Sequence, residues 1–137
     1  MNKFLKLHNS DDNGVIVVNK DQINAIVSFY DKKDRLTSKI YLNAECSIAP
    51  FIVNETPSII IKPEEKEFIT VHDFETNNVI IIRKTEISIV DTIRINGYNT
   101  LKSKIYFCGN TDMTPINVHE SAEKLLNNLS ENIELEK

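Results

Sequence analysis

The chain has 137 residues, of which 41% are hydrophobic and 26% are charged, and its formal net charge is −4. This composition predicts one compact domain or two very small ones and excludes a largely disordered chain. The acidic balance disfavours nonspecific nucleic-acid binding, because neutralised phosphates supply most of that affinity, and no run of about 20 apolar residues predicts a membrane helix.

The first predicted strand covers residues 4–8, where Leu5 and Leu7 alternate with polar positions and point to one face. Residues 15–18, like residues 79–82 further along the chain, are apolar on both faces, which predicts central, fully covered strands. A short polar turn or a single helical turn at residues 19–22 leads into a third strand at residues 23–29. The chain has only three glycines, so we expect its tight turns to use asparagine and aspartate, which tolerate left-handed backbone.

The fourth strand is predicted at residues 38–42 and the fifth at residues 51–53, each with alternating apolar positions. The pair Thr56-Pro57 then indicates the start of a helix, with threonine as cap and proline at the first helical position. Pro63 ends that helix after one or two turns at most.

The same pattern recurs 64 to 65 positions later, with identical residues in the same order and one inserted residue. A tandem duplication explains this series better than chance does. We expect a first repeat at residues 1–63, a linker at 64–67, a second repeat at 68–130 and a charged tail at 131–137. The second repeat keeps a longer closing helix, from the N-cap Ser121 to Leu129. The identical pairs are Phe4 and Phe68, His8 and His72, Asn13 and Asn77, Val15 and Val79, Ile16 and Ile80, Lys20 and Lys84, Ile23 and Ile87, Ser38 and Ser103, Lys39 and Lys104, Ile40 and Ile105, Tyr41 and Tyr106, Pro50 and Pro115, Val53 and Val118, and Glu55 and Glu120.

These elements predict a mostly β protein with minor α content. Each repeat is expected to be a five-stranded meander or small open barrel closed by a short helix. Two equivalent units in one chain also suggest a pseudo-twofold arrangement, like a homodimer within one polypeptide.

No catalytic, cofactor-binding or metal-binding constellation is predicted. The sequence has no Gly-x-Ser-x-Gly motif and too few glycines for a phosphate-binding loop. Cys46 and Cys108 form no Cys-x-x-Cys pair and do not occupy equivalent repeat positions. His8 and His72 are equivalent, but a metal site needs further ligands at suitable spacing, so we expect histidines on the strand surface. The thiols and the absence of a signal-peptide pattern at residues 1–7 favour a cytoplasmic protein.

The candidate interaction surface combines six residues on the predicted strands. Alternation places a lysine and a tyrosine of each fourth strand on the face opposite its inward apolar residues. Such a row could bind protein or single-stranded nucleic acid, or it could be a tyrosine packed under a lysine stem. The candidates are Lys39, Tyr41, Lys104, Tyr106, His8 and His72.

Each repeat resembles the small FlbD-type proteins, a family named for flagella and swarming motility, and single-copy small proteins of Bacteroides-type bacteria. The resemblance rests on Phe-x-x-Leu/Val at the start of a repeat, on Val-Ile-Val-Val-Asn-Lys-Asp-Gln-Ile-Asn-Ala-Ile at residues 15–26, and on Val-His-Glu-Ser-Ala-Glu at residues 118–123. It implies no activity or catalytic residues. The order of strands and closing helix is also similar to that of LytTR-type DNA-binding domains, which usually present basic loops to DNA.

The functional prediction is a non-enzymatic interaction or scaffold protein that binds another protein or a second copy of itself, without a cofactor or a membrane partner. The alternative is a LytTR-like nucleic-acid-binding regulator that uses the lysine and tyrosine rows together with Lys32, Lys33 and Arg35. The net acidic charge disfavours this alternative.

Overall fold

The computed structural model describes residues 3–46, 48–94, 97, 101–108 and 113–129. In these ranges the chain forms ten strands, two α-helices and three single-turn 3-10 helices, which confirms the mostly β prediction. The predicted charged tail at residues 131–137 lies outside the described residues. The strands are β1 (Phe4–His8), β2 (Val15–Asn19), β3 (Ile23–Tyr30), β4 (Leu36–Leu42), β5 (Phe51–Val53), β6 (Phe68–His72), β7 (Val79–Arg83), β8 (Ile87–Ile93), β9 (Lys102–Phe107) and β10 (Ile116–Val118); the α-helices are α1 (Pro57–Ile60) and α2 (Ala122–Leu129); the 3-10 helices are η1 (Lys20–Gln22), η2 (Ala44–Cys46) and η3 (Lys84–Glu86).

Asparagine and aspartate take left-handed positions in the turns between strands, as predicted. Asn13, Asp34 and Asn77 all have positive φ values, of 59°, 59° and 60°. Asn13 and Asn77 lie in the β1–β2 and β6–β7 connections, and Asp34 lies between β3 and β4. Their short polar side chains tolerate this left-handed backbone better than other residues with a Cβ atom.

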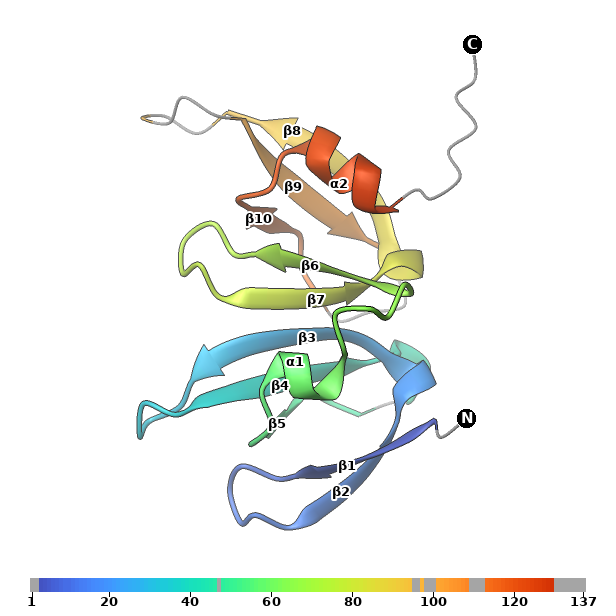
Figure 1. Ribbon diagram of the computed structural model, residues 1–137, viewed down its shortest axis with the longest axis vertical. Helices are drawn as coiled ribbons and strands as arrows, with labels where there is room; N and C mark the ends of the chain where they lie inside the picture. Colours follow the sequence, from blue (N-terminus) through green and yellow to red (C-terminus); the bar gives the residue numbers. More distant parts are fainter. Residues whose placement is uncertain (1–2, 47, 95–96, 98–100, 109–112, 130–137) are drawn as a thin grey trace.

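The ten strands divide into three sheets, with no closed barrel among the described residues. β1 and β2 form a hairpin, and β8, β9 and β10 form an antiparallel meander. The third sheet joins the two halves of the chain in the order β5-β4-β3-β7-β6 (Figure 1). The five strands of each predicted repeat are therefore present, but they do not form one meander. The reason is that β2 and β3 are not neighbours: η1 redirects the chain between them, and β3 pairs with β7 instead.

The described strands do not show the predicted twofold relation between the halves. A twofold axis that exchanged the halves would turn the β3–β7 pair into a pair of β8 with β2 in the same chain. The described part of β8 pairs only with β9, and β2 pairs only with β1. β2 and β8 lie at opposite ends of the long axis (Figure 1). The halves are therefore joined head to tail.

Two apolar clusters fill the interior, and both cross the junction between the halves. The first is built around Ile26 and Ile40, and it includes Phe68 and Ile81 from the second half. In the second cluster, Val27 of the first half packs against residues of the second half. The short helix α1, which ends before Pro63 as predicted, contacts both β3 and β7, whereas α2 packs on β8.

Neither described helix is long and apolar enough to cross a membrane.

Candidate interaction surfaces

The predicted lysine and tyrosine rows lie on β4 and β9. The Nζ atom of Lys39 is 5.4 Å from the centre of the Tyr41 ring, and Lys104 and Tyr106 repeat the same distance. Because β4 and β9 belong to different sheets, the two pairs do not form one continuous row. Within each pair the lysine lies over its own tyrosine, which is the packing alternative raised by the sequence, and such a contact is worth about 0.5–1 kcal/mol at an exposed site.

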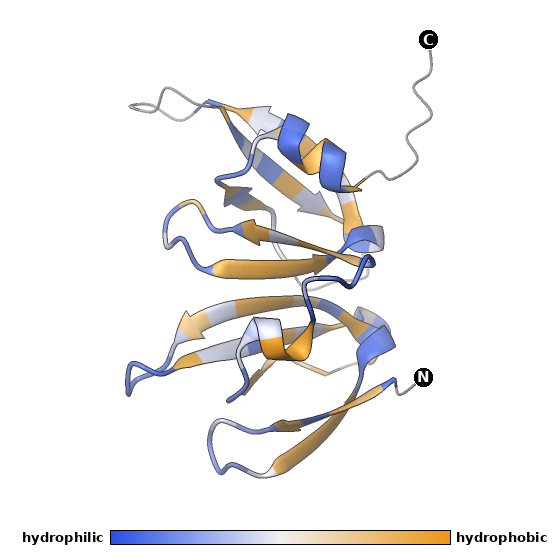
Figure 2. Ribbon diagram, viewed as in Figure 1, coloured by the Kyte–Doolittle hydropathy of each residue, from blue (hydrophilic) through white to orange (hydrophobic). Residues whose placement is uncertain are grey.

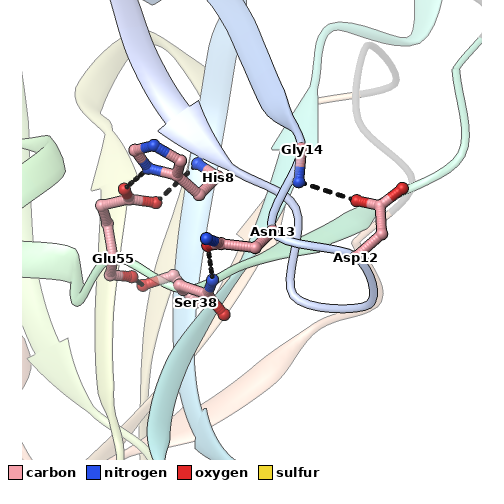
Figure 3. A network of polar contacts seen from close by, with 7 residues as sticks. His8, Asp12, Asn13, Gly14, Ser38 and Glu55 are labelled. Atoms are coloured by element: carbon pink, nitrogen blue, oxygen red, sulfur yellow. Dashed lines mark hydrogen bonds and ion pairs between the residues drawn. The ribbon is translucent and has the colours of Figure 1, made fainter.

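His8 and His72 each bind a glutamate from the segment that follows the last strand of their half. The Nδ1 atom of His8 is 2.6 Å from Oε2 of Glu55, and the His8 backbone N–H donates to Oε1 of the same carboxylate at 2.9 Å (Figure 3). His72 makes the same two contacts with Glu120, at 2.7 and 2.9 Å. These pairs link the first strand of each half to the end of its last strand.

The histidine contacts favour the charged form of the two glutamates. Burial raises the pKa of Glu55, but hydrogen bonds from the His8 ring and backbone outweigh this effect and hold the pKa below its ordinary value. The pKa of Glu120 is lowered by the same balance, with His72 as the donor. Among the described residues, no three histidine, cysteine, aspartate or glutamate side chains come together as metal ligands do.

The polar contacts around Glu55 connect neighbouring strands and turns. The Ser38 hydroxyl donates to the Glu55 carbonyl at 2.7 Å, and Asn54 donates from its side-chain amide to Asn13 at 2.9 Å (Figure 3). Both oxygens of the Glu55 carboxylate already accept hydrogen bonds from His8. Glu55 therefore joins the segment after β5 to β1 through its carboxylate and to β4 through its backbone carbonyl.

The junction between β3 and β7 shows how one half of this chain recognises the other. Ala25 pairs with Ile82, Ile26 with Ile81, and Val27 with Ile80 in an antiparallel ladder. The ladder is extended by the Val79 backbone N–H, which donates to the hydroxyl of Ser28 at 2.9 Å. The strands that meet here are apolar and buried: Ala25 is 0% and Ile81 is 4% exposed.

Arg83 clamps one end of this junction. Its Nε atom donates to the carbonyl of Ile23 at 2.8 Å, and a terminal guanidinium nitrogen donates to the carbonyl of Lys20 at 2.7 Å. The guanidinium carbon lies 4.5 Å from the centre of the Phe68 ring. One side chain of the second half thus holds two backbone carbonyls of the first half.

The outer edges of β2 and β8 carry apolar residues that face solvent. Val15 and Val17 of β2 are 58% and 64% exposed, and Ile89 of β8 is 56% exposed. The prediction of a central, fully covered strand therefore holds for β7 but is wrong for β2, which is an outer strand (Figure 2). Long apolar edges of this kind are rare in isolated proteins because they recruit other strands.

A groove accompanies each of these edges. A groove of about 570 Å³ lies between β8 and α2, and its lining includes Val90 and Leu126. A second groove of about 450 Å³ lies beside β2, and its lining includes Phe4 and Val17. Most of the surface that lines both grooves is apolar, although Lys84, Ser88 and Glu123 also line the groove beside β8. Each sheet edge together with its groove is here called the β2 end or the β8 end.

The sequence did not single out these two ends or Arg83. The sequence did contain a signal for Arg83. The corresponding residue in the first half is Asn19, although the residues on either side of the two positions are similar or identical. Comparison with protein-family models, with curated proteins and with solved structures finds no match for this chain.

Proposed function

We propose that this chain is a tandem duplication of one β unit and that it works as a non-enzymatic interaction protein, which binds another polypeptide by strand addition at its free sheet edges. The observation that carries the proposal is the exposure of Val17 and Ile89 on outer strands. A free edge presents unpaired backbone groups that an added strand can satisfy, and adjacent apolar side chains provide selectivity.

The duplication is supported by contacts that recur at the same spacing. β1 pairs with β2 in the register Phe4 to Asn19, and β6 pairs with β7 in the register Phe68 to Arg83. The β3–β4 ladder shifts register between residues 23 and 25, and the β8–β9 ladder shifts between residues 87 and 89. The histidine–glutamate pairs described above add a contact between side chains distant in sequence that has the same geometry in both halves. A common origin with FlbD-type proteins remains part of this proposal.

Binding through the edges is supported by the weak protection of the described β2 and β8 strands. Natural edge strands are commonly guarded by lysine, proline or a bulge that prevents pairing. β2 reads Val-Ile-Val-Val-Asn and contains none of these residues. β8 has one charged residue, Asp91, and a register shift between residues 87 and 89. The corresponding shift in β3, between residues 23 and 25, does not prevent β3 from pairing with β7.

An affinity experiment with matched variants tests the proposal. The tagged wild-type chain, V17K, I89K and the control I59K are each used to capture proteins from an extract of the native host. Ile59 is 57% exposed on α1, so the control introduces the same charge at the same exposure away from both edges. We expect a partner that wild type and I59K retain and that an edge variant loses, and the purified partner should reproduce this pattern. A partner held equally by all four, or specific catalytic turnover by the pure chain, would contradict the proposal.

A LytTR-like nucleic-acid-binding role is the second candidate, and one surface favours it. Phe29, Tyr30, Lys32, Lys33 and Arg35 line one depression at the β3–β4 turn, where rings could stack on bases and cations could meet phosphates. Arg35 is already paired with Asp31, with 2.9 Å between Nε and Oδ2. Anisotropy of labelled single-stranded and duplex DNA at low salt decides: binding that weakens as salt rises supports this role, and no binding eliminates it.

A further inference from the structure

We propose that the polypeptide bound at the free edges is a second copy of this chain, and that the β8 end of one copy adds to the β2 end of the next. The contact repeats, between chains, the β3–β7 junction that joins the two halves within a chain. This inference rests on the proposed duplication and on strand addition as the mode of binding.

The two ends of the chain correspond to the two sides of the internal junction. β8 occupies the position of β3 in the second half, and β2 occupies the position of β7 in the first half. Transferring the internal register pairs Ile89 with Val18, Val90 with Val17, and Asp91 with Ile16 of the next copy. Each chain therefore carries one free copy of both surfaces that already recognise each other in its own interior.

Residues at the two ends are exposed where the corresponding residues of the internal junction are buried. Ala25 of β3 is 0% exposed in the junction, whereas the corresponding Ile89 of β8 is 56% exposed. Ile81 of β7 is 4% exposed, whereas Val17 of β2 is 64% exposed. The side chains are apolar at all four positions. Addition of a second copy would therefore bury Ile89 and Val17 as the internal junction buries Ala25 and Ile81.

The surfaces beside the strands follow the same rule. In the internal junction, Ile61 after α1 and Phe68 of β6 belong to one apolar cluster and are 3% and 8% exposed. Their counterparts, Leu126 of α2 and Phe4 of β1, are 49% and 56% exposed. Leu126 lines the groove at the β8 end and Phe4 lines the groove at the β2 end. Pairing of the ends would bring these two residues together, as Ile61 and Phe68 are brought together inside the chain.

The polar contacts of the junction are partly retained at the ends. Ser28, which accepts the Val79 backbone N–H, corresponds to Thr92, whose hydroxyl can accept the Val15 backbone N–H of the next copy. Arg83, which clamps two carbonyls, corresponds to Asn19, which is too short to reach across. The contact between chains thus keeps the ladder and most of the apolar surface, but it lacks the clamp and has Asp91 in place of Val27. We therefore expect a reversible association weaker than the internal junction.

The geometry of the ends determines the kind of assembly. The β2 end and the β8 end lie at opposite extremes of the long axis (Figure 1), so one chain cannot join its own ends. The contact uses two different surfaces, which makes it heterologous; such contacts build rings when the rotation closes and open stacks when it does not. Either form leaves no more than one free copy of each end.

Sedimentation velocity of the purified chain and of two complementary variants tests the inference. Wild type should grow from the 15.7 kDa of one chain to larger species as its concentration rises from micromolar to millimolar. V17K blocks the β2 end and I89K blocks the β8 end, so each variant alone should remain a single chain. An equimolar mixture should form a species of two chains and nothing larger, because only the β8 end of V17K can meet the β2 end of I89K. I59K should behave like wild type, and circular dichroism checks that all variants keep their strands.

The alternative outcomes are distinguishable. Dimers of V17K alone would indicate a symmetric contact between β8 ends, and dimers of I89K alone a symmetric contact between β2 ends; either overturns the inference. A wild-type chain that stays monomeric, with no complex in the mixture, overturns it as well. In that case a host protein that is captured by wild type and lost by an edge variant would leave the proposed function standing, whereas the absence of both results would remove both.

Discussion

The carboxylate of Glu120 binds His72 twice: Oε2 lies 2.7 Å from the ring Nδ1 atom, and Oε1 accepts the backbone N–H at 2.9 Å. Glu55 binds His8 in the same way. In both halves the residues lie almost 50 positions apart in sequence, and the contact fixes the end of the first strand against the segment that leads into the helix.

Removing these carboxylates should destabilise the fold. E120Q or E55Q replaces a charged acceptor by a neutral amide at a site where both oxygens are used, and a hydrogen bond to a charged group is worth about 1.5–3 kcal/mol. We expect each variant to lose about 1–3 kcal/mol in urea unfolding at neutral pH, with the larger loss for E120Q, because the Glu120 side chain is 8% exposed and that of Glu55 is 17% exposed. The exposed Glu123 on α2 provides the control, E123Q, which should change stability by less than about 0.5 kcal/mol.

The same pairs predict a loss of stability in acid. The folded pKa of Glu55 and Glu120 lies below the ordinary value of 4.5, so the stabilisation is fully present above pH 4.5 and is lost as the pH falls through the folded pKa. The free energy of unfolding of wild type should therefore decrease as the pH is lowered below 4.5. The double variant E55Q/E120Q should show a shallower decrease over the same range. Equal slopes for wild type and double variant would contradict the assignment.

The sequence predicted the strands and turns well because those features are local. Alternating apolar residues define β1 and β4, and asparagine takes the left-handed position at residues 13 and 77. The arrangement of the sheets could not be predicted. An apolar run such as Val-Ile-Val-Val indicates a strand that is buried on both faces, but it does not identify the neighbouring strand with which it pairs. β7 pairs with β3 as well as β6, whereas β2 pairs only with β1 among the described residues.

The candidate site was predicted only in part for the same reason. His8 and His72 lie on β1 and β6, but their glutamate partners are distant in sequence and no local spacing reveals them. The lysine and tyrosine pairs are two residues apart on one strand, so alternation was sufficient to place them on one face. Arg83 holds the junction by binding the backbone carbonyls of Lys20 and Ile23. Because these acceptors are about 60 residues away in sequence, no local pattern reveals them.

Loss of the Arg83 clamp should loosen the junction without unfolding either hairpin. R83A removes two hydrogen bonds to carbonyls and the contact with the Phe68 ring, which together should cost about 1–3 kcal/mol. Hydrogen–deuterium exchange should show faster exchange of amides in the β3–β7 ladder, while β1–β2 amides keep their protection. R83K should restore little, because an ammonium group cannot reproduce the two directed contacts of a guanidinium. R35A, which breaks an exposed pair, is the control.

The reverse change should strengthen the proposed contact between copies. N19R places at the β2 end the side chain that clamps the internal junction, and the carbonyls of Lys84 and Ile87 in the next copy correspond to its two acceptors. Within the chain, N19R removes the hydrogen bond from the Asp21 N–H to the Asn19 side chain. The turn should tolerate this loss, because η3 forms the same turn after Arg83 without such a hydrogen bond. Two added charge-assisted hydrogen bonds should tighten self-association by about 10- to 100-fold, measured as the shift in the concentration at which sedimentation velocity detects species larger than one chain. The gain should vanish in N19R/I89K, because the clamp acts only where the β8 end can dock; a gain that survives I89K would place the contact elsewhere.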